Sequence, residues 1–276
     1  MTSACGVVAR LMMLASIASA LQAQSAAKEP ISDNSFLIEE SYNQDPGVVQ
    51  HISTLARTFN QRGWAYTFTQ EWPVPGRTHQ LSYTIPLLNA GSVTGVGDVM
   101  LNYRYQAVED DERGIAFSPR VSMSVPTGDY KKLFGVGNIG WQVSLPVSKT
   151  LGESFVSHTN AGATWWPSAR MAGDGASISA VNLGQSLVWL MTPRFNFMLE
   201  SIWSRTTTRA HGANTSSESA FISPGIRWGY DFPSGLQIVP GVAVPIGVGP
   251  SRGTRQLVLY LSFEHPFTEA ARPHPK

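Results

Sequence analysis

Hydrophobic and polar residues alternate with a period of two along most of the chain. In residues 64–69 the even positions, Trp64, Tyr66 and Phe68, are aromatic, whereas the odd positions are small or polar. Successive side chains of a β-strand point to opposite faces, so this spacing predicts half-buried strands. Similar apolar stripes run through 81–87, 99–105, 115–125, 181–189, 195–203, 236–246 and 257–263.

Turn residues divide these stripes into twelve candidate strands. Several of them exceed the ~9–11 residues that a strand needs to cross a bilayer. An even number of strands lets both termini of the chain lie in the periplasm. The predicted strands are 48–60, 63–72, 78–88, 97–108, 114–127, 137–149, 154–166, 177–192, 194–205, 219–231, 235–247 and 254–267.

The connections between these strands are alternately short and long, except that the first external connection, at 61–62, is also short. Outer-membrane barrels have short periplasmic turns and longer external loops, so the alternation supports this class. The predicted periplasmic turns are 73–77, 109–113, 150–153, 193 and 232–234, and the long external loops are 89–96, 128–136, 167–176, 206–218 and 248–253. We expect 206–218, which is rich in Thr and Ser, to be a flexible loop; contact with external ligands is the alternative.

The composition favours a membrane barrel over a soluble domain. Only 14% of residues are charged, against roughly 25% in soluble domains. Past the N-terminus no run reaches the ~18 apolar residues that a spanning helix needs. The fold class predicted is therefore all-β, a transmembrane antiparallel up-and-down β-barrel of about 12 strands in the bacterial outer membrane. The eight tryptophans fall mostly in strands or near their ends, as in an aromatic girdle; the alternative is the core of a soluble sandwich.

The N-terminal residues have the features of a secretory signal peptide, which we assign to 1–23. Arg10 precedes the apolar run Leu11–Leu21, and small residues surround a cleavage point after Ala23. The only cysteine, Cys5, leaves with this leader. The chain has 20 basic and 19 acidic residues, so removal of Arg10 balances the charges and argues against a nucleic-acid partner.

The remaining chain divides into three parts. Residues 24–47 are polar and aperiodic, and form either a periplasmic N-terminal segment or a plug within the lumen. Residues 48–267 form the barrel and 268–276 a C-terminal tail. The period of two in the last strand, ending at Phe267, resembles the C-terminal signal of outer-membrane barrels. The expected partners are therefore outer-membrane lipid and, through this strand, the barrel assembly machinery.

Three stretches carry a resemblance to a known family. They are 36–51 (FLIEESYNQDPGVVQH), 95–105 (GVGDVMLNYRY) and 124–129 (SVPTGD). They resemble an outer-membrane barrel family labelled for the meta pathway of phenol degradation, whose members are often called transporters. The resemblance implies a barrel that admits small or aromatic molecules, and it supplies no functional residues.

Three motifs invite a chemical interpretation and favour a structural one. The G-x-G-x-x-G string at 135–140 lacks the strand before it and the helix after it that dinucleotide binding requires. In the strand containing His158, Ser157 and Thr159 point to the opposite face, so no hydroxyl is expected beside His158 for nucleophilic catalysis. The acidic run 109–112 is expected to be a solvated turn; a cation site is the alternative. We predict no catalytic, cofactor-binding or metal-binding residue.

Four charged residues lie on the polar faces of well-patterned strands. A charge on the lipid side costs ~2–4 kcal/mol near the midplane, so these side chains are expected to point into the lumen. The candidate lumen-lining residues are Arg104, Arg120, Glu200 and Arg227. The sequence predicts a channel or transporter for small solutes, aromatic or hydrophobic ones included. The alternatives are a closed structural or ligand-binding barrel held by an interior salt-bridge network and a membrane-embedded hydrolase.

Overall fold

The computed structural model describes residues 31, 33–59, 61–172 and 175–267. The predicted leader 1–23 and tail 268–276 lie outside these residues, and so do residues 24–30 of the predicted N-terminal segment. Among the described residues, no helix is long and apolar enough to cross a membrane.

Seventeen hydrogen-bonded segments form one antiparallel sheet. The segments are β1 Val48–Thr58, β2 Trp64–Pro73, β3 His79–Asn89, β4 Thr94–Val96, β5 Val99–Tyr105, β6 Val108–Asp110, β7 Ile115–Phe117, β8 Arg120–Val125, β9 Gly140–Leu151, β10 Phe155–Trp166, β11 Ser177–Thr192, β12 Phe195–Ala210, β13 Ala213–Trp228, β14 Tyr230–Asp231, β15 Gln237–Ala243, β16 Ile246–Gly247 and β17 Gln256–Pro266. Four strands of the barrel are interrupted by short breaks, so that β4–β6, β7–β8, β13–β14 and β15–β16 each make up one strand, and the barrel has twelve strands. Three single-turn 3-10 helices lie in the connections, at Tyr130–Lys132, Arg170–Ala172 and Gly249–Ser251.

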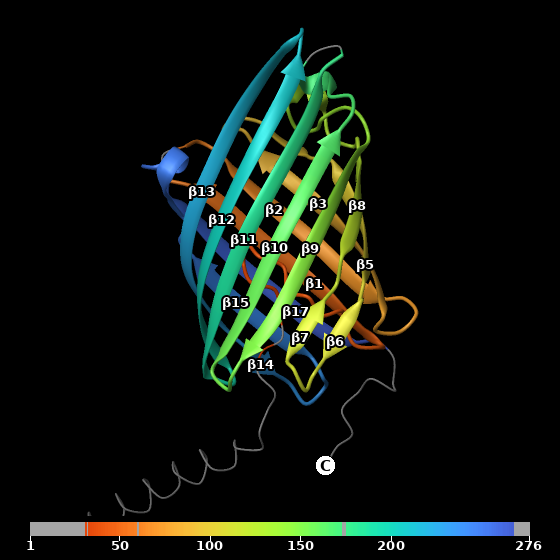
Figure 1. Cartoon of the computed structure of the whole chain (residues 1–276), viewed down its shortest axis with the longest axis vertical. Coiled ribbons are helices and arrows are strands. Elements are labelled where there is room, and N and C mark those ends of the chain that lie inside the picture. Colours follow the sequence, from red (N-terminus) through yellow and green to blue (C-terminus); the bar gives the residue numbers. More distant parts are fainter. Residues whose placement is uncertain (1–30, 32, 60, 173–174, 268–276) are drawn as a thin grey trace, which may run out of the picture. The chain divides into compact units, whose positions relative to one another are not determined.

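The sheet closes on itself between its first and last strands. β1 pairs with β17 from Val48 opposite Pro266 to Thr58 opposite Gln256, and its other edge pairs with β2. The remaining strands each pair with the next along the chain, as Figure 1 shows. Closure leaves no free sheet edge, which is the condition for strands to cross hydrocarbon.

The period of two in the sequence separates an apolar outer face from a polar inner face. Leu183 and Val121 point outward and are 54% and 47% exposed. Their neighbours Asn182 and Ser122 point inward. The tryptophans at 141, 165, 189 and 203 are also exposed on the outside, in agreement with a girdle rather than a core. The outer surface is thus suited to acyl chains.

The expectation of a flexible loop at 206–218 is wrong. β12 and β13 continue to Ala210 and from Ala213 as a long hairpin, paired along its whole length. His211 and Gly212 both have positive φ, 51° and 76°, as a two-residue type I′ turn requires. Hydroxyls join the two strands, as in the 3.0 Å hydrogen bond between Thr207 and Ser216.

Candidate functional site: the barrel lumen

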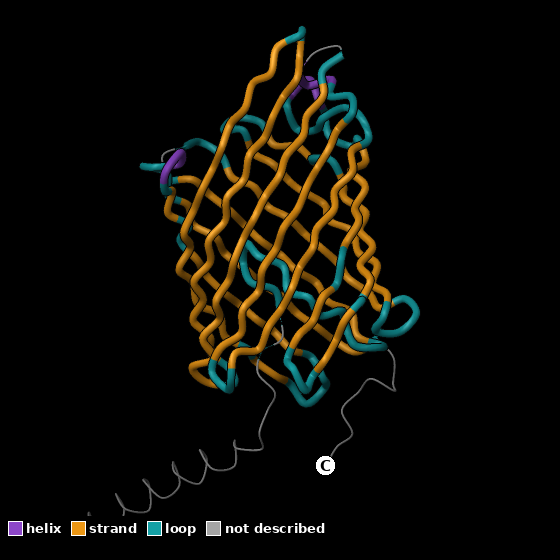
Figure 2. The backbone as a smooth tube through the Cα atoms, viewed as in Figure 1, coloured by secondary structure: helices purple, strands orange, loops and turns teal. Residues whose placement is uncertain are grey.

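Most of the described N-terminal segment, residues 31 and 33–44, lies inside the barrel, whereas Asp45 and Pro46 are exposed. Figure 2 shows it as a loop crossing the interior before the chain enters β1. The backbone N–H of Glu40 donates to Oδ1 of Asn34 at 3.0 Å, which closes the tip of this loop. Ser41 is completely buried. We refer to residues 31 and 33–44 as the plug.

Arg227 on β13 holds the start of the plug. Its guanidinium donates to the backbone carbonyls of Ile31, Asp33 and Asn34, at 3.2 Å for Ile31 and 2.9 Å for Asn34. The Nε–H donates to Oδ1 of Asn196 at 3.1 Å, which fixes the side chain against β12. A wall arginine therefore satisfies backbone acceptors that would otherwise be buried without partners.

Glu200 on β12 holds the tip of the plug. Its Oε1 accepts hydrogen bonds from the backbone N–H groups of Leu37 and Ile38, at 2.8 and 3.1 Å. The side chain is fully buried. Arg227 and Glu200 thus bind opposite ends of one short stretch, the first through carbonyls and the second through N–H groups.

Arg104 on β5 holds the return of the plug toward β1. Its nitrogens donate to Oδ1 of Asn43 at 2.8 Å and to the backbone carbonyls of Glu40 and Tyr42. It also donates to Gln80 on β3 at 3.2 Å. Arg104 therefore crosslinks plug and wall.

Arg120 on β8 pairs with the plug residue Glu39. Its Nε lies 2.9 Å from Oε1 and 3.1 Å from Oε2 of Glu39. Arg104 shares this carboxylate at 3.4 Å. Burial by itself raises the pKa of Glu39, but the charges of Arg120 and Arg104 outweigh it and hold the pKa below its ordinary value.

The four residues predicted to face the lumen lie there, and all four contact the plug. The structure brings Arg104 and Arg120 together through Glu39, whereas Glu200 and Arg227 act on the plug separately. Sequence reasoning missed the partner acid Glu39, whose carboxylate pairs with Arg120 and Arg104. A signal was available in the sequence, because the N-terminal segment 24–47 contains acids and three of the residues predicted to face the lumen are arginines.

Wall glycines make room for the apolar side chains of the plug. A Cβ on Gly225 of β13 would lie 2.5 Å from Cε2 of Phe36, and one on Gly184 of β11 would lie 2.2 Å from Cδ1 of Ile38. Phe36 also meets Tyr260 edge to face at a centroid distance of 5.4 Å. The wall and the plug are therefore complementary in shape.

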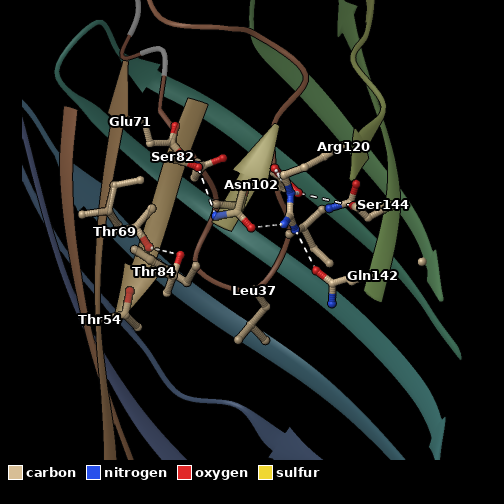
Figure 3. Close-up of a pocket in the computed structure, with 18 of the residues that line it drawn as sticks. Leu37, Thr54, Thr69, Glu71, Ser82, Thr84, Asn102, Arg120, Gln142 and Ser144 are labelled. Carbon is tan, nitrogen blue, oxygen red and sulfur yellow. Dashed lines mark hydrogen bonds and ion pairs between the residues drawn. The ribbon is translucent and has the colours of Figure 1, made fainter. Parts of the chain in front are cut away.

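A cavity of about 290 Å³ adjoins the tip of the plug. Figure 3 shows Thr54, Thr69 and Thr84 on one side, Gln142 on the other, and Leu37 between them. Arg120 and Asn102 also line it, with the amide of Asn102 donating to Ser82 at 3.1 Å. The lumen thus contains a small, mostly polar space beside the plug.

The expectation that no hydroxyl lies beside His158 is wrong, because it considered only the strand of His158. Antiparallel pairing of β9 and β10 places Ser148 opposite His158. The Ser148 hydroxyl lies 2.7 Å from Nδ1 of His158 and accepts the backbone N–H of Ser41 at 2.9 Å. Both side chains are buried beneath the plug, so the pair anchors Ser41 and does not line the cavity.

The other two motifs have structural surroundings. Gly140, the last glycine of the G-x-G-x-x-G string, begins β9, so no helix follows the motif. In the acidic run, Glu109 pairs with Arg77 and Asp110 pairs with Arg113. Within the described part of the chain, no three side chains of His, Cys, Asp or Glu come together as a metal site.

The closed barrel with an apolar outer face and a polar lumen defines the chain as an outer-membrane β-barrel. It belongs to the family described as "Putative MetA-pathway of phenol degradation", whose model matches residues 45–263. No curated protein matches the sequence.

Two solved structures share the fold. The COG4313 outer membrane channel from Pseudomonas putida F1 aligns with a TM-score of 0.60 and 12% identity, over 82% of this chain and 97% of that chain. The NanC porin aligns with a TM-score of 0.52 and 9% identity, over 78% and 98%. At these identities the likeness concerns the fold.

Proposed function

We propose that this protein is an outer-membrane channel for small solutes. The observation that carries the proposal is the polar cavity of about 290 Å³ enclosed by a barrel whose outside is apolar. A closed structural barrel would gain stability from filling this space with side chains. Two of the proteins that share the fold are an outer membrane channel and a porin, which supports the same function.

The plug makes the channel a closed one in this conformation. Between Ile31 and Gln44, its backbone and side chains are hydrogen-bonded to β3, β5, β9, β12 and β13. These residues occupy the part of the lumen through which a solute would pass from the cavity toward the end of the barrel where β1 begins and β17 ends. Passage therefore requires the plug to shift or leave.

The test is single-channel conductance of the refolded mature chain in planar bilayers, with small aromatic and aliphatic solutes added as blockers. Folding is verified by heat-modifiable migration on a detergent gel, because a closed barrel resists unfolding without boiling. We expect discrete openings that one class of solute reduces. Complete silence from folded protein would contradict the proposal.

The second candidate function is a closed ligand-binding barrel. It is favoured by the number of buried contacts between plug and wall, including all four wall charges described above. Such a barrel would bind solute in the cavity without conducting ions. Binding combined with absence of conductance would therefore select this candidate.

Two partners follow from the same geometry. Membrane lipid would cover the apolar outer face, and the barrel assembly machinery would engage β17, which closes the sheet against β1. A variant with polar residues at the outward positions Leu259 and Leu261 should assemble poorly in cells. Normal assembly of that variant would argue against recognition through β17.

A further inference from the structure

We propose that the cavity beside the plug binds uncharged solutes that carry several hydroxyl or carbonyl groups. This inference rests on the proposed function and names the class of solute.

The charged groups that face the cavity already have partners. Arg120 pairs with Glu39 at 2.9 Å and donates to Oδ1 of Asn102 and Oε1 of Gln142, at 3.0 and 3.2 Å. Glu71 accepts from Gln80 at 2.7 Å and its Oε2 lies 4.0 Å from a guanidinium nitrogen of Arg104. An ionic solute would lose its hydration and find no unpaired counter-charge, which disfavours its binding.

Uncharged polar groups in the cavity remain free to bind a solute. Among the described residues, the side chains of Thr54 and Asn182 have no hydrogen-bond partner, and Asn160 is 7% exposed with its Oδ1 unpaired. Thr54 lies on β1, and the two asparagines lie on β10 and β11, across the closed sheet. Hydroxyl and amide groups both donate and accept, so the two walls match a solute with hydroxyls or carbonyls on both sides.

The floor of the cavity is apolar. Leu37 at the tip of the plug is half-buried, and Phe36 and Ile52 also line the cavity. A ring can rest its C–H face on such a floor while its polar groups reach the walls. The volume of about 290 Å³ exceeds the ~150 Å³ of an engineered cavity that binds benzene, so one substituted six-membered ring fits.

The test is isothermal titration calorimetry of the full mature chain in detergent, with probes that share one ring frame. Glucose is the uncharged probe, glucuronate the anion and glucosamine the cation, and phenol is the apolar probe. We expect glucose to bind at least tenfold more tightly than the other three. Tighter binding of phenol, tighter binding of a charged probe, or no binding of any probe would each overturn the inference.

Near-isosteric variants test the assigned side chains. A single hydrogen bond contributes ~0.5–1.5 kcal/mol, so Asn182→Leu and Thr54→Val should each weaken glucose binding about twofold to tenfold. Thr159→Val is the matched control, because Thr159 points outward and bonds to Gln185. Unchanged glucose affinity in both cavity variants would contradict the assignment.

The Arg120–Glu39 pair gives a reciprocal test. Glu39→Gln leaves Arg120 without its counter-charge and should move the preference toward glucuronate by tenfold or more. Arg120→Gln should move it toward glucosamine. An unaltered preference in both variants would show that this pair does not set the charge of the site.

Conductance separates this inference from the proposed function. A wild-type protein that conducts but binds no glucose would retain the channel and lose the inference. A protein that binds glucose as described but never conducts would retain the inference and lose the channel.

Discussion

Substitution of Arg227 by methionine should release the plug while leaving the strand pairing of the barrel intact. Methionine has a similar length and is apolar, so it fills the space but cannot donate to the carbonyls of Ile31, Asp33 and Asn34. A hydrogen bond to a charged group contributes ~1.5–3 kcal/mol. Because the freed carbonyls regain water once the plug moves, we expect a net loss of about 3 kcal/mol, or roughly a 150-fold larger undocked fraction.

Thiol labelling measures this fraction. Ser35 is buried against Ser186, and the predicted mature chain has no cysteine, so Ser35→Cys supplies a single reporter for a water-soluble maleimide. Labelling should accelerate about 100-fold in Arg227→Met. The control is Arg205→Met, since Arg205 pairs with Glu218 on the β12–β13 hairpin, away from the plug. Labelling within threefold of the parent, in a barrel that still migrates as folded, would refute the reasoning.

Three further predictions concern the plug and the outer face. Phe36→Ala removes the contact with Tyr260 and should accelerate labelling of the same reporter, by a loss of about 3 kcal/mol. Burial, together with neighbouring carboxylates, raises the pKa of Glu40 to about 8. The docked plug therefore keeps a proton on Glu40 that the undocked plug releases above the ordinary pKa of 4.5, so docking weakens as the pH rises. Labelling of the reporter, corrected for the pH dependence of the thiol reaction itself, should accelerate from pH 5 to 8, and less steeply in Glu40→Gln. Leu183→Arg on the outer face should lower the free energy of unfolding in lipid vesicles by ~2–4 kcal/mol. Thr215→Arg on the exposed hairpin is the control and should leave the free energy of unfolding nearly unchanged. Equal effects of the two substitutions would argue against a lipid-facing Leu183.

The sequence was sufficient to predict the strands that lie within the membrane. There one face meets hydrocarbon and the other meets the polar lumen, so each strand must alternate, as 181–189 does. The same constraint located the four charges, because an ionised side chain on the lipid face is expensive. Beyond Arg205 the hairpin carries polar side chains on both faces, such as Thr207 and Thr208. Its strands need no apolar stripe, and residues 206–218 therefore resembled a loop.

The site depends on contacts that no local pattern records. The plug is aperiodic because its backbone bonds to side chains of the wall rather than to a neighbouring strand. The pairing of Ser148 with His158 depends on the register of β9 against β10, which periodicity leaves open. The glycine at 225 reads as a weak strand residue in the sequence, and its reason becomes visible only when Phe36 lies against it.

A reversible crosslink between plug and wall tests the account most directly. The hydroxyl oxygens of Ser35 and Ser186 are 2.8 Å apart, so the double variant Ser35→Cys/Ser186→Cys should form a disulfide that locks the plug. Ser204→Cys/Ser219→Cys is the matched control, with oxygens also 2.8 Å apart but both on the wall. We predict that the locked barrel is silent in single-channel recordings and conducts after reduction, while the control conducts in both states. Full conductance with the Ser35–Ser186 crosslink intact would contradict the claim that solutes pass only when the plug moves.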